Sequence, residues 1–305
     1  MSDHSKGKLS WSQYGITVAG GNGSGSGLNQ LHHPWDFCID QNETIYVAEC
    51  SNHRITAHRL NSSIVEIVAG GKGNGNRLNQ LNGPGNVIVD TRNQNLIIAD
   101  QGNRRVMRWS LEKNSRGEIL ASDIFCWGLA LDSQGYLYVS DFKEHIVKRW
   151  KIGDPIGTVI AGNREKGDRR DQLFAPGNIV LDENDALFIS DIGNCRVMKW
   201  LPAATEGTIF AGGNGSGSDL CKISYPSGIA TDRQDSILVV DSSNHRVIRW
   251  DLNSTEGTLL IGGKGPGDEP DQLDGPIGLK FDGKENIYVA DNLNHRIQKF
   301  LSNSN

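Results

Sequence analysis

A short pattern recurs six times along this chain of 305 residues, and it constrains the fold more than any other feature of the sequence. In each copy an acidic residue ends an apolar run and precedes a polar turn, as in DSSNHRV from Asp241 and DNLNHRI from Asp291. The six acids are spaced by 51, 41, 50, 50 and 50 residues, and they are Glu49, Asp100, Asp141, Asp191, Asp241 and Asp291. A fixed period of this length indicates a repeat architecture.

Within one copy the sequence predicts four short β-strands and no helix. Residues 228–232, 236–240, 245–250 and 257–261 are β-rich runs bounded by turn residues. Four strands in 40 to 50 residues are typical of one β-propeller blade. The predicted fold is therefore all-β, a six-bladed β-propeller of four-stranded blades that forms one domain over residues 1–305. The expected blades are 35–69, 85–121, 127–161, 177–211, 228–261 and 278–300.

The two ends of the chain predict how the ring closes. The last copy, 278–300, has sequence for only three strands, while GITVAGG at 15–21 matches the outer strand GTLLIGG at 257–263. We expect residues 15–19 to pair with the strand at 295–300. This pairing covers two sheet edges that would otherwise be open to aggregation.

Composition excludes several other classes of protein. Hydrophobic residues make up 37% and charged residues 22% of the chain, which is ordinary for a soluble globular protein. The net charge of −5 disfavours a nucleic-acid partner. Residues 1–15 are polar, and no run of about 18 apolar residues occurs, so the sequence predicts neither a signal peptide nor a membrane span. Glycine-rich strings such as GGNGSGSG recur without a following helix, which disfavours a phosphate-binding loop.

The cysteines and glycosylation sequons leave the compartment open. Five cysteines without a CxxC motif are typical of reduced thiols, and this slightly favours the cytoplasm over secretion. Five N-x-S/T sequons point weakly the other way. Cys195 and Cys221 lie on connections of adjacent copies, and the sequence does not decide whether they pair.

The recurrent pattern P-x-G-I-x-x-D, followed by a segment such as YVADNLNHRI at 288–297 or LVVDSSNHRV at 238–247, resembles the NHL-repeat family. The resemblance covers about 290 residues and implies a β-propeller. Families with this repeat include RNA-binding and substrate-recruiting domains of ubiquitin ligases and a metal-dependent amidating lyase. Function therefore has to be argued from particular site residues.

Residues that recur in most copies are explained by the blade itself. We expect the repeated acids and arginines to form charge-assisted bonds across the turn, and the tryptophans at 109, 150, 200 and 250 to fill the core between blades. The repeated turn histidines are His53, His145, His245 and His295. They lie about 15 Å from the axis at the usual strand spacing, so they cannot share one metal ion. His32 and His33 are adjacent but lack a third ligand.

The third copy departs from this pattern. It has Glu144 and Ile146 where other copies carry Asn and Arg, and its preceding connection is short. These changes indicate either a flattened docking sector on one face or simple drift of the repeat, and drift is the favoured interpretation.

The starts of the inner strands are the best candidate site, because they are the only repeated positions close enough to the axis to converge. Three copies carry glycine as the third residue, and the others carry Asp36, Asn86 and Asn178. One carboxylate and two amide oxygens suit calcium. The alternative is that these residues replace glycine at a positive φ angle. The full predicted ligand-binding set is Trp35, Asp36, Asn86, Trp127, Asn178 and Ser227.

Three functions fit these observations. The favoured one is a monomeric, non-catalytic module that recognises a protein, peptide or glycan through one face and the channel mouth, with no cofactor required. The second is a calcium-dependent hydrolase or lactonase-like enzyme with its site in the channel. The amidating lyase has zinc-binding histidines after the inner-strand proline, and this chain has Trp35 and Ser227 at two such positions. The third is single-stranded RNA binding or substrate recruitment, which requires a basic face.

Overall fold

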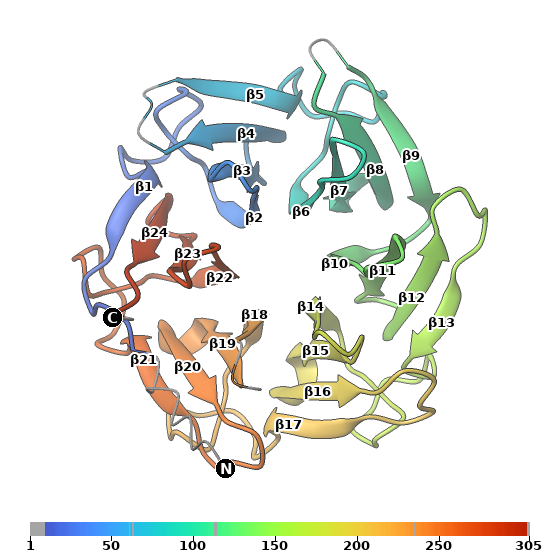
Figure 1. The fold of residues 1–305 in the computed structure, drawn as a ribbon, viewed down its shortest axis with the longest axis vertical. Coiled ribbons are helices and arrows are strands. Elements are labelled where there is room, and N and C mark those ends of the chain that lie inside the picture. The colour runs from blue at the N-terminus through green and yellow to red at the C-terminus, as the bar shows by residue number, and fades with distance from the viewer. Residues whose placement is uncertain are drawn as a thin grey trace, which may run out of the picture.

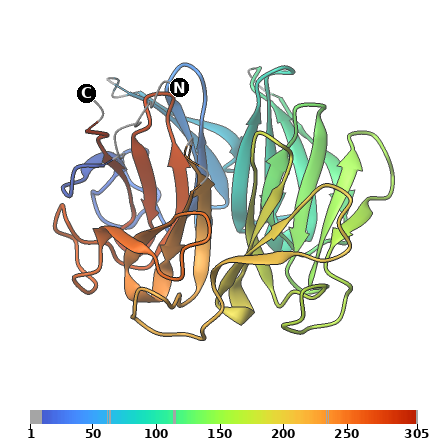
Figure 2. The ribbon, with the colours of Figure 1, turned by 60° about the horizontal axis from the view of Figure 1, so that its bottom comes forward.

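The computed structural model describes residues 10–60, 62, 64–112, 115–232, 234 and 236–303, which form six β-sheets around a central axis (Figure 1). Each sheet is a blade of four antiparallel strands. The strands run between two faces of the ring, where the connections gather (Figure 2). The predicted six-bladed, all-β propeller is confirmed.

The first three blades follow one another along the chain. Blade one contains β2 (Pro34–Ile39), β3 (Thr44–Glu49), β4 (Arg54–Arg59) and β5 (Val65–Gly70). Blade two contains β6 (Pro84–Asp90), β7 (Asn95–Asp100), β8 (Arg105–Ser110) and β9 (Gly117–Ser122). Blade three contains β10 (Cys126–Leu131), β11 (Tyr136–Asp141), β12 (Ile146–Lys151) and β13 (Thr158–Ala161).

The last three blades complete the ring. Blade four contains β14 (Pro176–Leu181), β15 (Leu187–Asp191), β16 (Arg196–Trp200) and β17 (Thr208–Gly212). Blade five contains β18 (Pro226–Thr231), β19 (Ile237–Asp241), β20 (Arg246–Trp250) and β21 (Thr258–Gly262). Blade six contains β22 (Pro276–Phe281), β23 (Ile287–Asp291), β24 (Arg296–Phe300) and β1 (Ile16–Gly20).

Three of the polar turns are short 3-10 helices, where the sequence predicted no helix. They are η1 (Gln101–Asn103), η2 (Ile192–Asn194) and η3 (Ser242–Asn244). Among the described residues, no helix has the length and apolar character needed to cross a membrane.

All six inner strands begin at one face of the ring, which we call the upper face. It carries the connection that leads from each outer strand to the next inner strand, namely 21–33, 71–83, 123–125, 162–175, 213–225 and 263–275. It also carries the turns between the second and third strands, because the start of each inner strand pairs with the end of the second strand, as Pro34 does with Glu49.

The ring closes through the N-terminal strand. β1 pairs with β24 in antiparallel register, with Ile16 opposite Lys299 and Gly20 opposite Arg296. Trp11 precedes β1 and is 4% exposed, and its Nε1 donates to the Glu285 carbonyl at 2.7 Å. The predicted closure is confirmed, and the buried Trp11 extends it beyond the strand itself.

The hydrophobic core lies between neighbouring blades. Six clusters of buried side chains occur, and each one combines residues from two adjacent blades. The repeated aromatic position contributes Trp109, Trp150, Trp200, Trp250 and Phe300 to five of them. Their predicted place in the interblade core is confirmed.

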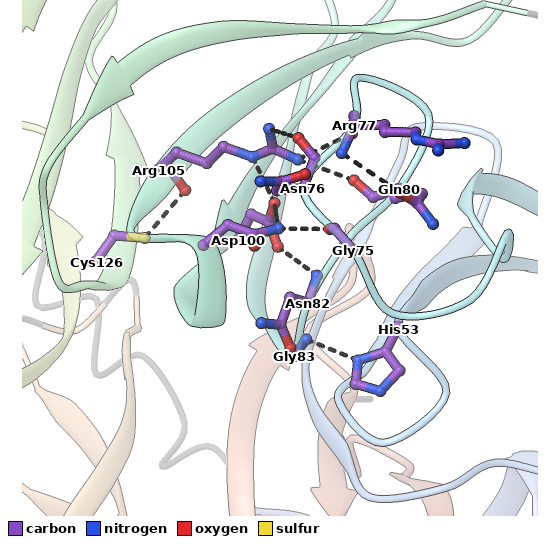
Figure 3. A network of polar contacts seen from close by, with 11 residues as sticks. His53, Gly75, Asn76, Arg77, Gln80, Asn82, Gly83, Asp100, Arg105 and Cys126 are labelled. Atoms are coloured by element: carbon purple, nitrogen blue, oxygen red, sulfur yellow. Dashed lines mark hydrogen bonds and ion pairs between the residues drawn. The ribbon is translucent and has the colours of Figure 1, made fainter.

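The repeated acids and arginines fasten the upper connections to the blades. In blade two, Asp100 Oδ2 accepts hydrogen bonds from Asn103 Nδ2 at 2.8 Å and Arg105 Nε at 2.7 Å. The Arg105 guanidinium also donates to the carbonyls of Asn76 and Gln80 (Figure 3). The equivalent arginine pairs with its acid in blades one, four, five and six. The predicted charge-assisted bonds are confirmed.

The repeated turn histidines join one blade to the next. All four have positive φ angles, between 52° and 58°. Each Nδ1 accepts a hydrogen bond from a backbone N–H just before the next inner strand. The donors to His53, His145, His245 and His295 are Gly83, Ala175, Gly275 and His33 (Figure 3 shows the first). Their recurrence therefore has a structural cause.

Candidate functional site

The candidate site is built on an irregularity that all six inner strands share. The register between β2 and β3 shifts between Pro34 and Phe37, so Trp35 and Asp36 lie in a β-bulge. The corresponding shift occurs in the other five blades. A bulge redirects side chains out of the regular pleat. It affects the second and third residues of five inner strands, and in blade two it lies between Pro84 and Asn86, where Asn86 already pairs with Ala99.

Asp36, Asn86 and Asn178 meet inside the ring. Asp36 Oδ2 accepts hydrogen bonds from Asn86 Nδ2 at 2.8 Å and from Asn178 Nδ2 at 2.9 Å. Asn178 belongs to β14, which lies across the ring from β2 (Figure 1). All three side chains are buried. The convergence expected from their strand positions is therefore present, and it ties three blades together at the axis.

A fourth side chain, Lys280 of β22, joins this cluster. Its Nζ lies 3.2 Å from Asp36 Oδ2, and the two side chains are 23% and 2% exposed. Burial raises the pKa of the Asp36 carboxyl, while Lys280, the Phe37 N–H and Asn178 act in the opposite direction. We call Asp36, Asn86, Asn178 and Lys280 the axial cluster. Lys280 could not be predicted from the repeat, because the other copies carry no lysine at its position.

The glycines at the third position serve close packing and not backbone freedom. None of these six third residues, all within the described chain, has a positive φ, so the alternative that the polar residues replace strained glycines is wrong. A Cβ on Gly128 would lie 2.6 Å from the Gly177 carbonyl oxygen, and one on Gly278 would lie 2.5 Å from Asp36 Oδ1. The three blades with glycine at this position therefore leave room near the axis, and the side chains of Asp36, Asn86 and Asn178 from the other three blades occupy it.

The predicted calcium site would require a rearrangement of the axial cluster. The two amide groups present their nitrogens to Asp36, and a cation there would compete with the Lys280 ammonium. The described residues contain no group of three or more His, Cys, Asp or Glu side chains that could hold a metal ion. The calcium site stays a prediction.

Aromatic side chains gather at the starts of the inner strands and at the neighbouring upper turns. The ring centroids of Trp35 and Trp127 are 5.6 Å apart, with the planes at 75°. Phe142 and Tyr225 lie 6.0 and 6.4 Å from Trp127. These four residues come from blades one and three and from the connection before blade five, and all are at least partly exposed. We call them the mouth aromatics. Both tryptophans were predicted site residues.

Sequence reasoning missed Phe142 and Tyr225, although both stand out against the repeat. Phe142 directly follows the acid of the third copy, where other copies carry Cys, Gln, Ile, Ser or Asn. Tyr225 precedes the inner-strand proline, where Gly or Ala occurs in three other copies. Ser227 lies differently from the prediction: its side chain is fully buried and donates to the Ile277 carbonyl at 3.1 Å. It joins two blades and does not line the mouth.

Blade three leaves the mouth aromatics uncovered on one side. Its upper connection, 123–125, is much shorter than the others, and Phe125 within it lies 5.7 Å from Phe142. The Arg104 guanidinium and the Lys143 ammonium each lie 4.6 Å from the Phe125 centroid. Arg104 also pairs with Asp123 at 3.2 Å. The flattened sector and the mouth aromatics thus coincide.

Several buried polar atoms near the mouth have no hydrogen-bond partner in the described structure. They are Trp35 Nε1, Asn86 Oδ1, Gln101 Nε2 and Asp141 Oδ2. The side-chain amide of Gln101 lies against the backbone of Gly85, where a Cβ on that glycine would collide with it. Gln101 thus takes the place that tryptophan has in blades one and three. Buried polar groups in proteins normally have partners. Other atoms without a hydrogen-bond partner lie away from the mouth, on Trp200, Asp232, Arg249 and Trp250.

Two cavities lie elsewhere on the molecule. One of about 760 Å³ lies between the outer parts of blades one and two, and its lining includes Arg59, Ile67 and Trp109. A smaller one of about 220 Å³ lies between blades three and four, next to Tyr138 and Trp200. Neither is lined by the mouth aromatics or the axial cluster.

Comparison with family models settles the repeat. The model described as "NHL repeat" matches residues 31–57, 224–250 and 273–300. The chain carries NHL repeats in a six-bladed β-propeller. No curated protein matches the sequence significantly.

Solved structures with the same fold include binding proteins and lyases. The NHL propeller aligns with an auxiliary nutrient binding protein from Bacteroides thetaiotaomicron at 14% identity, over 97% of this chain and 78% of that chain, with a TM-score of 0.72. A virginiamycin B lyase from Staphylococcus aureus aligns at 12% identity, over 94% and 98% of the two chains, with a TM-score of 0.60. A nidogen/laminin complex aligns at 15% identity, over 82% and 90%, with a TM-score of 0.60. Identities this low establish the fold alone.

A cluster of three histidines lies on the upper face between blades six and one of the NHL propeller. The ring centroids of His32, His33 and His295 are 4.9 to 5.7 Å apart, and His33 Nδ1 lies 2.8 Å from Ser51 Oγ. His295 was not predicted as the third member. The repeated turn histidines were compared only with one another, and their contact with the connection that leads to the next blade was not considered. Burial, and then the neighbouring histidines, lower the pKa values of His33 and His295.

We expect the histidine contribution to the stability of the propeller to fall as pH falls from 8 to 5. The buried carboxyls act in the opposite direction, because burial raises their pKa values; they are Asp36, Asp100, Asp191, Asp241 and Asp291. Burial, and then the charge of Arg54, lower the pKa of His58 to about 4, and the pKa values of His33 and His295 are also lowered. The unfolded chain then binds more protons than the folded one below about pH 6.5. The contribution is present above that pH and is lost as pH falls toward the folded pKa. For His58 it amounts to about 3 kcal/mol.

Urea unfolding at pH 8, 6 and 5 measures this effect, and His58→Phe is the matched variant. Phenylalanine occupies the same repeat position in blade six, as Phe300. We expect the difference between His58→Phe and the unmodified protein to follow the titration of His58, because the other histidines and the buried carboxyls titrate in both proteins. A pH profile identical to that of the unmodified protein would show that His58 does not sense protonation in the folded state.

Proposed function

We propose that the NHL propeller is a recognition module that binds a ligand non-covalently at the upper mouth of its channel and does not transform it. The observation that carries this proposal is the group of mouth aromatics, which comes from three parts of the ring and stays partly exposed. Aromatic walls with a few fixed polar groups are typical of ligand sites. The short connection of blade three gives a ligand access to them.

The axial cluster supports binding over catalysis. Asp36 is 1% exposed, and its Oδ2 is held by two amides and an ammonium. A carboxylate held in this way positions the inner strands, whereas a general base must reach the atom that loses a proton. The hydrolase alternative requires a cation beside Asp36, where Lys280 already lies. Solved structures with this fold include nutrient-binding proteins and nidogen as well as lyases, so the fold itself favours neither function.

Fluorine NMR of 5-fluorotryptophan-labelled protein tests the proposal. The chain has seven tryptophans, of which Trp35 and Trp127 lie at the mouth. The other five, at positions 11, 109, 150, 200 and 250, are buried and serve as internal controls. We expect at least one member of a library of small sugars, capped peptides and nucleotides to shift the resonances of Trp35 and Trp127 and to remain chemically unchanged. A library that moves neither resonance, or a member that is consumed, would refute the recognition module.

A further inference from the structure

We infer that the ligand of the channel mouth is a neutral saccharide. This inference rests on the proposed recognition function and adds the chemical class of the ligand. It follows from three features of the mouth: the arrangement of its aromatic rings, the absence of charged side chains at its repeat positions, and its open hydrogen-bonding atoms.

The aromatic rings form a corner that suits a pyranose ring. Trp35 and Trp127 are nearly perpendicular, at 75°, and Phe142 is nearly perpendicular to Trp127, at 88°. A sugar ring has an apolar face of C–H groups and a rim of hydroxyls. It can therefore stack its C–H face on one indole while its edge meets the next ring. Partly exposed indoles offer this contact at little conformational cost, because they have few side-chain torsions to fix.

The repeat positions around the mouth carry no Asp, Glu, Lys or Arg. Three positions per blade form this rim: the residue before the inner strand, its second residue, and the residue after the acid. They contain aromatic, small, amide and hydroxyl side chains, two isoleucines, one histidine and one cysteine, and Ser227 among them is fully buried. In blade three they are Phe125, Trp127 and Phe142. A ligand with a phosphate, a carboxylate or an ammonium would lose its hydration here without gaining a fixed opposite charge.

The charges that flank this rim are already engaged within the protein. Arg104 pairs with Asp123 and stacks on Phe125, and Lys143 stacks on the same ring. Glu144, also on the upper turn of blade three, pairs with Arg164 at 3.1 Å. These contacts reduce the attraction of the sector for an ionic ligand, and they favour a neutral ligand over a charged peptide or a nucleic acid.

The open polar atoms match the hydroxyl group. Trp35 Nε1 and Gln101 Nε2 are donors without partners, and Asn86 Oδ1 is an acceptor without one. A hydroxyl both donates and accepts, so neighbouring hydroxyls on one sugar can satisfy this mixture. Asn86 is fully buried and links the rim to the axial cluster, which holds its amide in a fixed orientation. All three atoms are buried in the free protein. A bound hydroxyl would therefore reach them after a small side-chain movement or through one water, and would give them the partners that they lack.

The test uses the fluorotryptophan-labelled protein with three sets of probes: methyl glycosides of glucose, galactose, mannose and N-acetylglucosamine with their trisaccharides, acetylated and amidated neutral tripeptides, and glucose 6-phosphate. We expect at least one neutral saccharide to shift the Trp35 and Trp127 resonances, and glucose 6-phosphate to bind at least ten times more weakly. We expect Trp127→Ala to weaken saccharide binding at least tenfold. The matched control, Tyr14→Ala, removes an aromatic ring that is 65% exposed and precedes β1, the outer strand of blade six, and it should leave binding unchanged.

Each other outcome has a defined meaning. If tripeptides or glucose 6-phosphate shift the mouth resonances and no neutral saccharide does, the saccharide inference fails and the recognition module stands. If no probe shifts them, both fail. If Trp127→Ala does not fold, Tyr225→Ala replaces it, because Tyr225 is 41% exposed and contacts Trp127 from the edge of the mouth. If the variant that folds retains saccharide binding at full strength, the ligand binds elsewhere and the inference is overturned.

Discussion

Deletion of residues 1–20 will lower the thermal midpoint by at least about 10 °C or cause the protein to aggregate. β1 supplies the outer strand of blade six, and Trp11 fills the core between blades five and six, where its ring lies 6.1 Å from that of Phe281. Burial of one tryptophan contributes about 5 kcal/mol. In a chain of this size 1 kcal/mol corresponds to about 2 °C of thermal midpoint, so Trp11 alone accounts for about 10 °C. Loss of β1 also exposes the edge of β24.

Differential scanning calorimetry and size-exclusion chromatography measure the two expected effects, and Trp11→Ala in the full chain separates them. That variant loses the indole and keeps β1, so we expect it to melt at a lower temperature and to remain monomeric. The deletion variant should melt lower still and self-associate through the open strand. A deletion variant that stays monomeric with an unchanged midpoint would contradict closure through β1.

The fold could be predicted because its determinants are local and repeated. Each copy encodes its own strands and turns, and the spacing of the acids sets the number of blades. Even the closure was visible, since GITVAGG at 15–21 belongs to a pattern whose remaining strands lie at the other end of the chain. Where the strand pattern of one copy is ambiguous, the other copies resolve it. The fold could therefore be predicted without knowledge of side-chain conformations.

The candidate site was predictable in position but not in chemistry. Asp36, Asn86 and Asn178 converge because their places in the inner strands put them near the axis. Their partner Lys280 enters from two residues further along its own inner strand than the glycine at the equivalent site position. The length of a side chain and the local bulge decide whether it reaches across the ring, and the repeat pattern does not determine either of them. The sequence therefore predicted a cation ligand set where the protein supplies its own cation.

The departures of blade three have one common cause in the structure. In the other blades the arginine holds the carbonyls of a long upper connection, as Arg105 holds those of Asn76 and Gln80. Blade three has only residues 123–125 at this place, so no long connection has to be held, and the buried Ile146 replaces the arginine. The favoured interpretation of independent drift treated these changes as unrelated. Together they shorten one side of the mouth and leave Asp141 Oδ2 without the partners that its counterparts have.

Replacement of Lys280 by methionine will destabilise the propeller by about 3 kcal/mol at pH 8, since removal of one partner leaves a buried charge uncompensated. Asp36 is 1% exposed, whereas the Lys280 side chain is 23% exposed. The variants Lys280→Met, Asp36→Asn and the double variant, compared by urea unfolding, form a cycle that isolates the coupling between the two groups. We expect Asp36→Asn to recover most of the stability that Lys280→Met loses. If the stability loss of the double variant equalled the sum of the losses of the two single variants, the pair would be uncoupled.

The pH dependence of this loss distinguishes a charge effect from a packing effect. Lys280 lowers the pKa of Asp36 against the larger effect of burial, so its removal raises that pKa further. A carboxyl whose folded pKa lies above its unfolded value stabilises the fold at low pH, and this stability is lost as pH rises through the folded pKa. The deficit of Lys280→Met should therefore be smaller at pH 5 than at pH 8. The histidines titrate in both proteins, so they cancel in the difference. If the deficit were the same at both pH values, Lys280 would act through the packing of its aliphatic chain, and Asp36 would be held by its two amide partners alone.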